Sequence, residues 1–153
     1  MTTDTGSFDL ERAMPLAPEQ LWHVLTDPKM RERWGAPSDD MVLSVVKSDL
    51  KVGGIERHIC GAKDNPDFEV ETRWYRLDAP NDATYTETLE FGGSAVGTSL
   101  VTYRVEEKAA GSMLYVHVSV ASFSGPDATG EFKEGWEGGL HNLEALAQEL
   151  ASN

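Results

Sequence analysis

The strongest constraint on the fold is a run of six short segments with strand character between residues 41 and 123. They alternate apolar with polar positions, and clusters of Gly, Pro, Asn and Asp separate them. Strands joined by such turns pair as an antiparallel meander. A further strand is expected over residues 7–16, so the sheet should have about seven strands. The six segments are 41–50, 55–61, 67–77, 83–91, 98–107 and 113–123, and turns are expected over 51–54, 78–82, 92–97 and 109–112.

Segments with helical patterns precede and follow this run of strands in the sequence. Within residues 17–34, Pro18 suits the first position of one short helix, and Asp27 and Pro28 suit the cap and first position of a second. Residues 129–150 predict a helix of about 20 residues, roughly 30 Å long. Its large apolar side chains fall on one stripe, formed by Phe132, Trp136, Leu140, Leu143, Ala147 and Leu150. One long helix on one face of an antiparallel sheet is an α+β architecture.

Three glycines interrupt the long helix and need an explanation. Gly135, Gly138 and Gly139 each cost roughly 1 kcal/mol relative to alanine in a helix interior. One explanation is a close approach of the helix backbone to the sheet, or a late start of the helix. The other is that the glycines leave room for a ligand between helix and sheet, and the sequence leaves both open.

Length and composition limit the classes of protein to which the chain could belong. Its 153 residues fit a single domain over 1–153, and 40% hydrophobic with 25% charged residues indicates a globular chain. A net charge of −13 disfavours nucleic acid and membrane surfaces as partners. The sequence has neither a secretory signal nor an apolar run long enough to span a membrane, so we expect a cytoplasmic protein. Cys60, the only cysteine, is expected to be an apolar filler.

Four sequence blocks carry a resemblance to a known group of proteins: Glu11–Arg12, Ala17–Trp34, Asp49–Gly54 and Gly135–Leu150. In order and spacing they resemble the helix-grip, START-like (SRPBCC) superfamily, and within it the activator-of-heat-shock-protein-90-ATPase-like family. The resemblance implies a curved sheet that grips the C-terminal helix around an apolar cavity. Such cavities commonly take hydrophobic small molecules, and the superfamily includes ligand carriers, polyketide cyclases and aromatases.

Glu87 is the least expected residue of the predicted sheet. At strand period it lies on the apolar face of segment 83–91, together with Tyr85 and Leu89. An ionised carboxylate that leaves water without a partner costs several kcal/mol. Glu87 must therefore form an ion pair, border a cavity, or lie where the strand is bulged. The ion-pair alternative has three candidate partners, Arg12, Arg57 and Arg73.

The strand predicted over residues 55–61 has an ambiguous alternation, with isoleucines on one face and Glu56, His58 and Cys60 on the other. The resemblance implies that the second face points inward. In that register Glu56, His58, Tyr85 and Glu87 would surround one cavity, where they could bind the polar end of a ligand or move a proton. Trp34, Trp74, Tyr103 and Trp136 are the candidates for its apolar walls.

These features lead to three functional hypotheses. The first is binding of a hydrophobic small molecule with a polar group, with no catalytic residue assigned. The second is an enzyme of the cyclase or dehydratase type, in which a cavity His or Glu moves a proton. The third is a chaperone-associated interaction protein, although 153 residues are too few to include the extra N-terminal domain of the chaperone activator itself. No motif has metal-ligand or nucleotide-binding spacing, so we expect neither a metal nor a cofactor. The sequence does not fix the oligomeric state and leaves a homodimer open.

Overall fold

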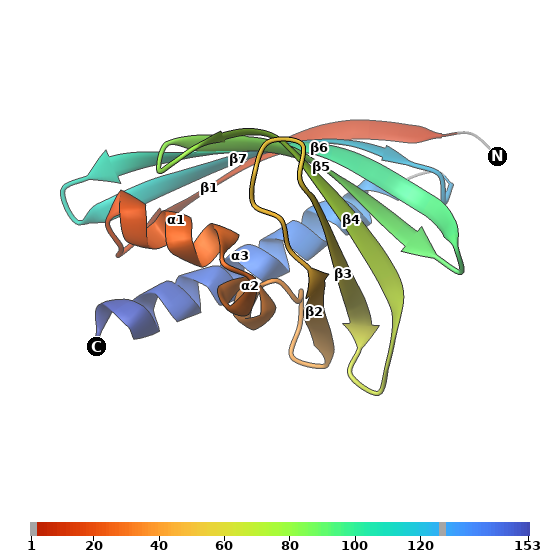
Figure 1. Cartoon of the computed structure of the whole chain (residues 1–153), viewed down its shortest axis with the longest axis horizontal. Helices are drawn as coiled ribbons and strands as arrows, with labels where there is room; N and C mark the ends of the chain where they lie inside the picture. The colour runs from red at the N-terminus through yellow and green to blue at the C-terminus, as the bar shows by residue number, and fades with distance from the viewer. Residues whose placement is uncertain (1–2, 126–127) are drawn as a thin grey trace.

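A computed structural model describes residues 3–125 and 128–153 and contains one seven-stranded antiparallel sheet with three helices on one side of it (Figure 1). Strands β2 to β7 pair in chain order as a meander, and β1 joins the edge beside β7. The strands are β1 Asp4–Met14, β2 Met41–Lys47, β3 Ile55–Ala62, β4 Asn65–Asp78, β5 Asp82–Phe91, β6 Ser94–Lys108 and β7 Gly111–Ser122. The helices are α1 Pro18–Thr26, α2 Pro28–Trp34 and α3 Thr129–Ala151. The α+β arrangement expected from the sequence is confirmed.

The two short helices begin where their prolines predict. Pro18 and Pro28 each occupy the start of a helix, where a missing N–H leaves no hydrogen bond unmade. Between the helices, the Asp27 side chain accepts a hydrogen bond from the Met30 backbone N–H, with an N–O distance of 3.2 Å. Asp27 therefore caps α2 as expected.

Three predicted turns are shorter in the structure than the sequence suggested: the one expected over 78–82, which spans 79–81, and two that contain glycines. The turn expected over 92–97 consists of Gly92 and Gly93 alone, and β6 already begins at Ser94. Both glycines have positive φ, +60° and +83°, the conformation that a two-residue hairpin turn requires. The turn expected over 109–112 is likewise shorter, since β7 begins at Gly111. A glycine cluster marks a turn, but its backbone geometry determines where the next strand begins.

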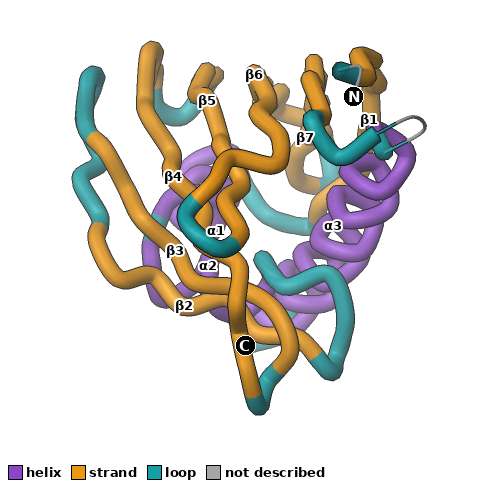
Figure 2. The backbone as a smooth tube through the Cα atoms, turned by 90° about the vertical axis from the view of Figure 1, so that its right-hand side faces the viewer, coloured by secondary structure: helices purple, strands orange, loops and turns teal. Residues whose placement is uncertain are grey.

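The sheet curves around α3 (Figures 1 and 2). The helix is held to β1 at two points: Asp4 accepts hydrogen bonds from Thr129, and Arg12 forms an ion pair with Glu144 at 2.9 Å. It also packs against β7 and α2, while α1 packs against β6 and β7. The fully buried residues of α3, Leu140, Leu143 and Ala147, belong to its second half and join the main hydrophobic core. In the described ranges, no helix is both long and apolar enough to cross a membrane.

Candidate functional site

A pocket of about 320 Å³ lies between α2, the first half of α3 and the inner face of β2 to β5. This volume equals that of about ten liquid waters and lies at the small end of the range for organic ligands. Most of the exposed wall is apolar. The large apolar side chains that form it are Trp34, Leu43, Val70, Leu89, Phe132 and Trp136. The pocket could therefore enclose the apolar part of a small organic molecule.

The glycines of α3 have different roles at different positions. The helix begins at Thr129, so the suggestion of a late start is wrong. At Gly138, an added Cβ would lie 2.3 Å from the Pro37 carbonyl oxygen, which shows a close approach between α3 and the loop after α2. At Gly135, which lines the pocket, an added Cβ would have no other atom within 4 Å. The close approach thus explains Gly138, and open space at the pocket explains Gly135.

Of the four aromatic residues predicted as pocket walls, two line the pocket. Trp34 and Trp136 form part of the lining, and the Trp34 indole donates a hydrogen bond of 2.8 Å to the Val24 carbonyl. Trp74 and Tyr103 are instead buried in the core, only 0% and 3% exposed.

These two residues belong to a chain of aromatic contacts that runs from the sheet to α1. The Trp74 ring lies 4.9 Å from the Tyr85 ring, and the Tyr103 ring lies 6.0 Å from both the Tyr85 and Trp22 rings. Because Trp22 belongs to α1, this helix covers the part of the inner face where Tyr103 lies. Side chains therefore fill this part of the face.

Glu56 and His58 point inward, so the register implied by the resemblance is confirmed. They are 2% and 1% exposed and lie in the core outside the pocket lining. Glu56 accepts a hydrogen bond of 3.0 Å from Ser48, and its other oxygen lies 3.7 Å from the His58 Nε2 atom. Burial tends to raise the pKa of the Glu56 carboxyl, but His58, Ser48, Arg31 and Trp74 together lower it below its usual value. Glu56 is therefore ionised at neutral pH.

Glu87 borders the pocket, which was one of the three explanations for its place on the apolar face. It stands opposite Thr72 of β4 and Ser99 of β6, in a polar row that continues to Glu56 of β3. The irregularity of β5 falls between Leu89 and Glu90, beyond Glu87, so a bulge does not explain its position.

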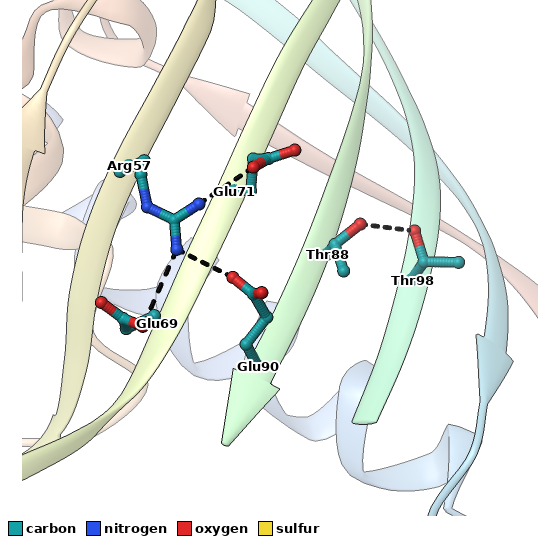
Figure 3. A network of polar contacts seen from close by, with 6 residues as sticks. All are labelled: Arg57, Glu69, Glu71, Thr88, Glu90 and Thr98. Atoms are coloured by element: carbon teal, nitrogen blue, oxygen red, sulfur yellow. Dashed lines mark hydrogen bonds and ion pairs between the residues drawn. The ribbon is translucent and has the colours of Figure 1, made fainter. Parts of the chain in front are cut away.

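None of the three candidate arginines forms an ion pair with Glu87. Arg57 lies on the outer face of the sheet, where it contacts Glu71 at 2.9 Å, Glu90 at 2.8 Å and Glu69 at 3.8 Å (Figure 3). Arg12 pairs with Glu144, and Arg73 stacks on Tyr75. The ion-pair explanation is therefore wrong, and within residues 3–125 and 128–153 no basic nitrogen lies within 4 Å of a Glu87 carboxylate oxygen.

Arg31 of α2 is a pocket residue that the sequence interpretation missed. Its side chain lines the pocket although the residue is only 7% exposed. The guanidinium carbon lies 5.4 Å from the centre of the Trp34 ring. In the described part of the chain, its Nε atom has no hydrogen-bond partner and no carboxylate oxygen lies within 4 Å of the guanidinium. The spacing to Trp34 was the available signal, because helical residues three apart share a face.

Cys60 and Tyr85 also line the pocket, and neither is ionised at neutral pH. Burial, together with the nearby Glu87 and Asp67 carboxylates, raises the pKa of the Cys60 thiol to about 11. A thiol of this kind is a poor nucleophile, as the filler hypothesis for Cys60 requires. Burial is also the main reason that the pKa of the Tyr85 hydroxyl lies well above its usual value. Among the residues placed by the structure, no group of three His, Cys, Asp or Glu side chains could hold a metal ion.

Known structures share this architecture over nearly their whole length. An uncharacterized protein from Rhizobium leguminosarum is 18% identical, with a TM-score of 0.83 and 97% of each chain covered. A protein from Chromobacterium violaceum is 22% identical, with a TM-score of 0.81, covering 92% of this chain and 96% of that one. An AHSA1-like protein from Aeromonas hydrophila is 24% identical, with a TM-score of 0.75, covering 96% and 94%. At these identities the likeness shows the helix-grip fold alone.

The sequence itself gives the family. No curated protein sequence matches the chain at a significant level. The family model described as activator of Hsp90 ATPase homolog 1-like protein matches residues 15–148, which include α1, α2, strands β2 to β7 and most of α3. The match therefore spans the pocket and nearly all of the sheet. This chain belongs to the activator of Hsp90 ATPase homolog 1-like family.

Proposed function

We propose that this protein binds a hydrophobic small molecule with a polar group in the pocket between α3 and the sheet. The observation that carries the proposal is the pocket of about 320 Å³, lined mainly by apolar side chains and bordered by Gly135. A solvent-accessible apolar wall favours an apolar ligand because binding removes apolar surface from water. Ionisable residues line the same pocket, and their polar groups would orient the ligand; they include Arg31, Tyr85, Glu87 and Glu131.

The geometry favours binding over acid–base catalysis. A catalytic base must come within hydrogen-bond reach of the proton that it removes. His58 is the histidine that the enzyme hypothesis invokes, and it is buried beside Glu56 outside the pocket lining. A chaperone-associated role would use a surface outside the pocket, and the pocket residues do not bear on it. Small-molecule binding is therefore the function that makes use of the pocket between α3 and the sheet.

The proposal can be tested by filling the pocket from α3. We suggest Gly135→Leu with Gly130→Leu as the matched control, since an added Cβ at either glycine has no other atom within 4 Å but only Gly135 lines the pocket. The probe is N-phenyl-1-naphthylamine, an uncharged fluorophore whose emission rises in apolar surroundings. The wild type and Gly130→Leu should bind it with similar affinity. Gly135→Leu should bind it at least tenfold more weakly.

Stability measurements separate loss of the pocket from loss of the fold. Both substitutions replace a helical glycine with a strong helix former, which favours the helix by about 0.5–1 kcal/mol. Both variants should therefore melt at or above the temperature of the wild type. Equal probe binding by Gly135→Leu and the wild type would contradict the proposal, and so would failure of the folded wild type to bind any apolar probe.

A further inference from the structure

We infer that the small molecule of the proposed function is an organic anion and that Arg31 binds its oxyanion group. The inference rests on the proposed function, because it specifies the chemistry of a ligand in the same pocket. It arises from a mismatch between how deeply Arg31 is buried and how few protein groups contact its charge. Among the residues that the structure describes, Arg31 is the one positively charged residue in the pocket lining.

Arg31 is a buried cation with an incomplete set of partners. The residue is 93% buried, since only 7% of its surface is exposed. A buried charge is costly unless it is paired and hydrogen-bonded. Trp34 provides an aromatic face at 5.4 Å, but an aromatic ring accepts no conventional hydrogen bond from the guanidinium fork. The protein groups that the structure describes therefore leave at least the Nε–H donor of Arg31 without an acceptor.

The buried carboxylate of Glu56 does not provide the missing partner. One of its oxygens accepts a hydrogen bond of 3.0 Å from Ser48, and the other lies 3.7 Å from the His58 Nε2 atom without a hydrogen bond. Neither oxygen lies within 4 Å of an Arg31 guanidinium nitrogen. The two charges do influence each other at longer range, because Arg31 contributes to the lowered pKa of the Glu56 carboxyl. This long-range attraction offsets part of the cost of burying the two charges, but the two groups make no direct contact. A ligand carboxylate, sulfonate or phosphate could form that contact, since the planar guanidinium binds two oxygens at once.

Two carboxylates share the pocket lining with Arg31, those of Glu87 on β5 and Glu131 on α3, and both limit where an anion can bind. Glu87 lines the same pocket as Arg31, and no guanidinium nitrogen of Arg31 lies within 4 Å of a Glu87 carboxylate oxygen. An oxyanion close to Glu87 would be repelled, whereas a hydroxyl or amine there could donate a hydrogen bond. The anionic group should therefore lie on the Arg31 side. The apolar part of the ligand would then rest against Trp34, Trp136 and Leu89.

Two matched fluorophores test the charge of the ligand. 8-Anilinonaphthalene-1-sulfonate has the same rings as N-phenyl-1-naphthylamine and adds one sulfonate. A hydrogen-bonded contact to a buried charge corresponds to about a tenfold to hundredfold change in affinity. We expect the wild type to prefer the sulfonate probe by at least tenfold. As a second measurement on the wild type, 2-naphthoate should displace bound probe at lower concentration than 2-naphthamide.

Variants then assign the preference to Arg31. Arg31→Met keeps an unbranched side chain but removes the charge, and it should abolish the preference for the sulfonate while retaining the uncharged probe. Arg31→Lys should keep part of the preference, because it keeps the charge without the planar fork. Arg33→Met is the control for non-specific attraction, since Arg33 lies on the same helix but is exposed and pairs with Glu149. Glu87→Gln should increase the preference, because it removes a like charge from the pocket.

The outcomes distinguish this inference from the proposed function. If the wild type and Arg31→Met bind both fluorophores with the same ratio of affinities, or if Arg33→Met loses the preference equally, the inference is wrong while small-molecule binding stands. If Arg31→Met does not fold, Arg31→Lys and the competition between 2-naphthoate and 2-naphthamide still decide. If the folded wild type binds neither fluorophore nor naphthoate, both the inference and the proposed function are wrong.

Discussion

Replacing Gly138 with alanine tests the close approach between α3 and the loop that follows α2. An added Cβ at Gly138 would lie 2.3 Å from the Pro37 carbonyl oxygen, whereas ordinary contacts begin near 3.4 Å. The backbone must therefore separate by about 1.1 Å, which is the difference between these two distances. At Gly135, one helical turn earlier, the same methyl group meets no other atom within 4 Å. The two substitutions share their chemistry and their helix, and they differ in this contact.

The two variants are expected to differ in the change of their free energy of unfolding relative to the wild type. Alanine in place of a helical glycine stabilises by about 0.5–1 kcal/mol, and this gain applies at both positions. Forcing extra volume into a packed site costs about 1–3 kcal/mol, and this cost applies only to Gly138→Ala. For a domain of this size, 1 kcal/mol shifts the melting temperature by about 2–4 °C. Gly135→Ala should therefore melt above the wild type and about 2–12 °C above Gly138→Ala.

Thermal unfolding followed by circular dichroism, with urea titration as a check, measures both variants. Gly135→Ala serves as the control for helix propensity. If Gly138→Ala is stabilised as much as Gly135→Ala, the contact between α3 and Pro37 does not exist as described. The wall of the pocket that this loop forms would then also be in doubt, because Pro37 and Gly139 both line it.

Two further predictions concern the buried ionisable groups. At pH about 8 the Cys60 thiol, with a pKa of about 11, should react with iodoacetamide about a hundredfold more slowly than an exposed thiol. Glu87→Gln should speed the reaction, because the Glu87 carboxylate helps to raise the pKa of the thiol. An unchanged rate would contradict the placement of Glu87 beside Cys60. The pKa of the Glu56 carboxyl is lower in the folded protein than in the unfolded chain, so ionised Glu56 stabilises the fold. This stabilisation is complete above the unfolded-state pKa of about 4.3, and it is lost as the pH falls through the folded-state pKa. The difference in urea midpoint between the wild type and Glu56→Gln should therefore be larger at pH about 7 than at pH about 3.5, and a constant difference would refute this assignment.

The fold could be predicted because its signals are local. Alternation along each strand, turn residues between strands and the apolar stripe of residues 129–150 each act over a few neighbouring residues. These signals located all seven strands, and errors were confined to boundaries such as Ser94, which begins β6 inside a glycine-rich stretch. The turn there needs only two glycines of positive φ, and the residues after them were free to join the ladder.

The candidate site was predicted less completely because it depends on which helix covers which strand. Trp74 and Tyr103 face inward as expected, but Trp22 of α1 contacts Tyr103 and this part of the face is filled by core. Periodicity places a side chain on the inner face without showing what covers it. Arg31 was missed for the complementary reason: a charged residue on a short helix is usually exposed. Packing of α2 against α3 and β2 buries it here.

The inner face of the sheet is thus divided between a packed core and the pocket. Side chains from α1 and the second half of α3 fill the part near β6 and β7, which holds most of the fully buried hydrophobic residues. The first half of α3 borders open space over β3 to β5, and Gly135 contributes no side chain to that space. Because Gly135 and Glu87 line the pocket but lie outside the hydrophobic core cluster, substitutions there can change the size and charge of the pocket while that core stays packed. The same division would let one helix-grip fold accommodate different ligands through changes in a few pocket residues.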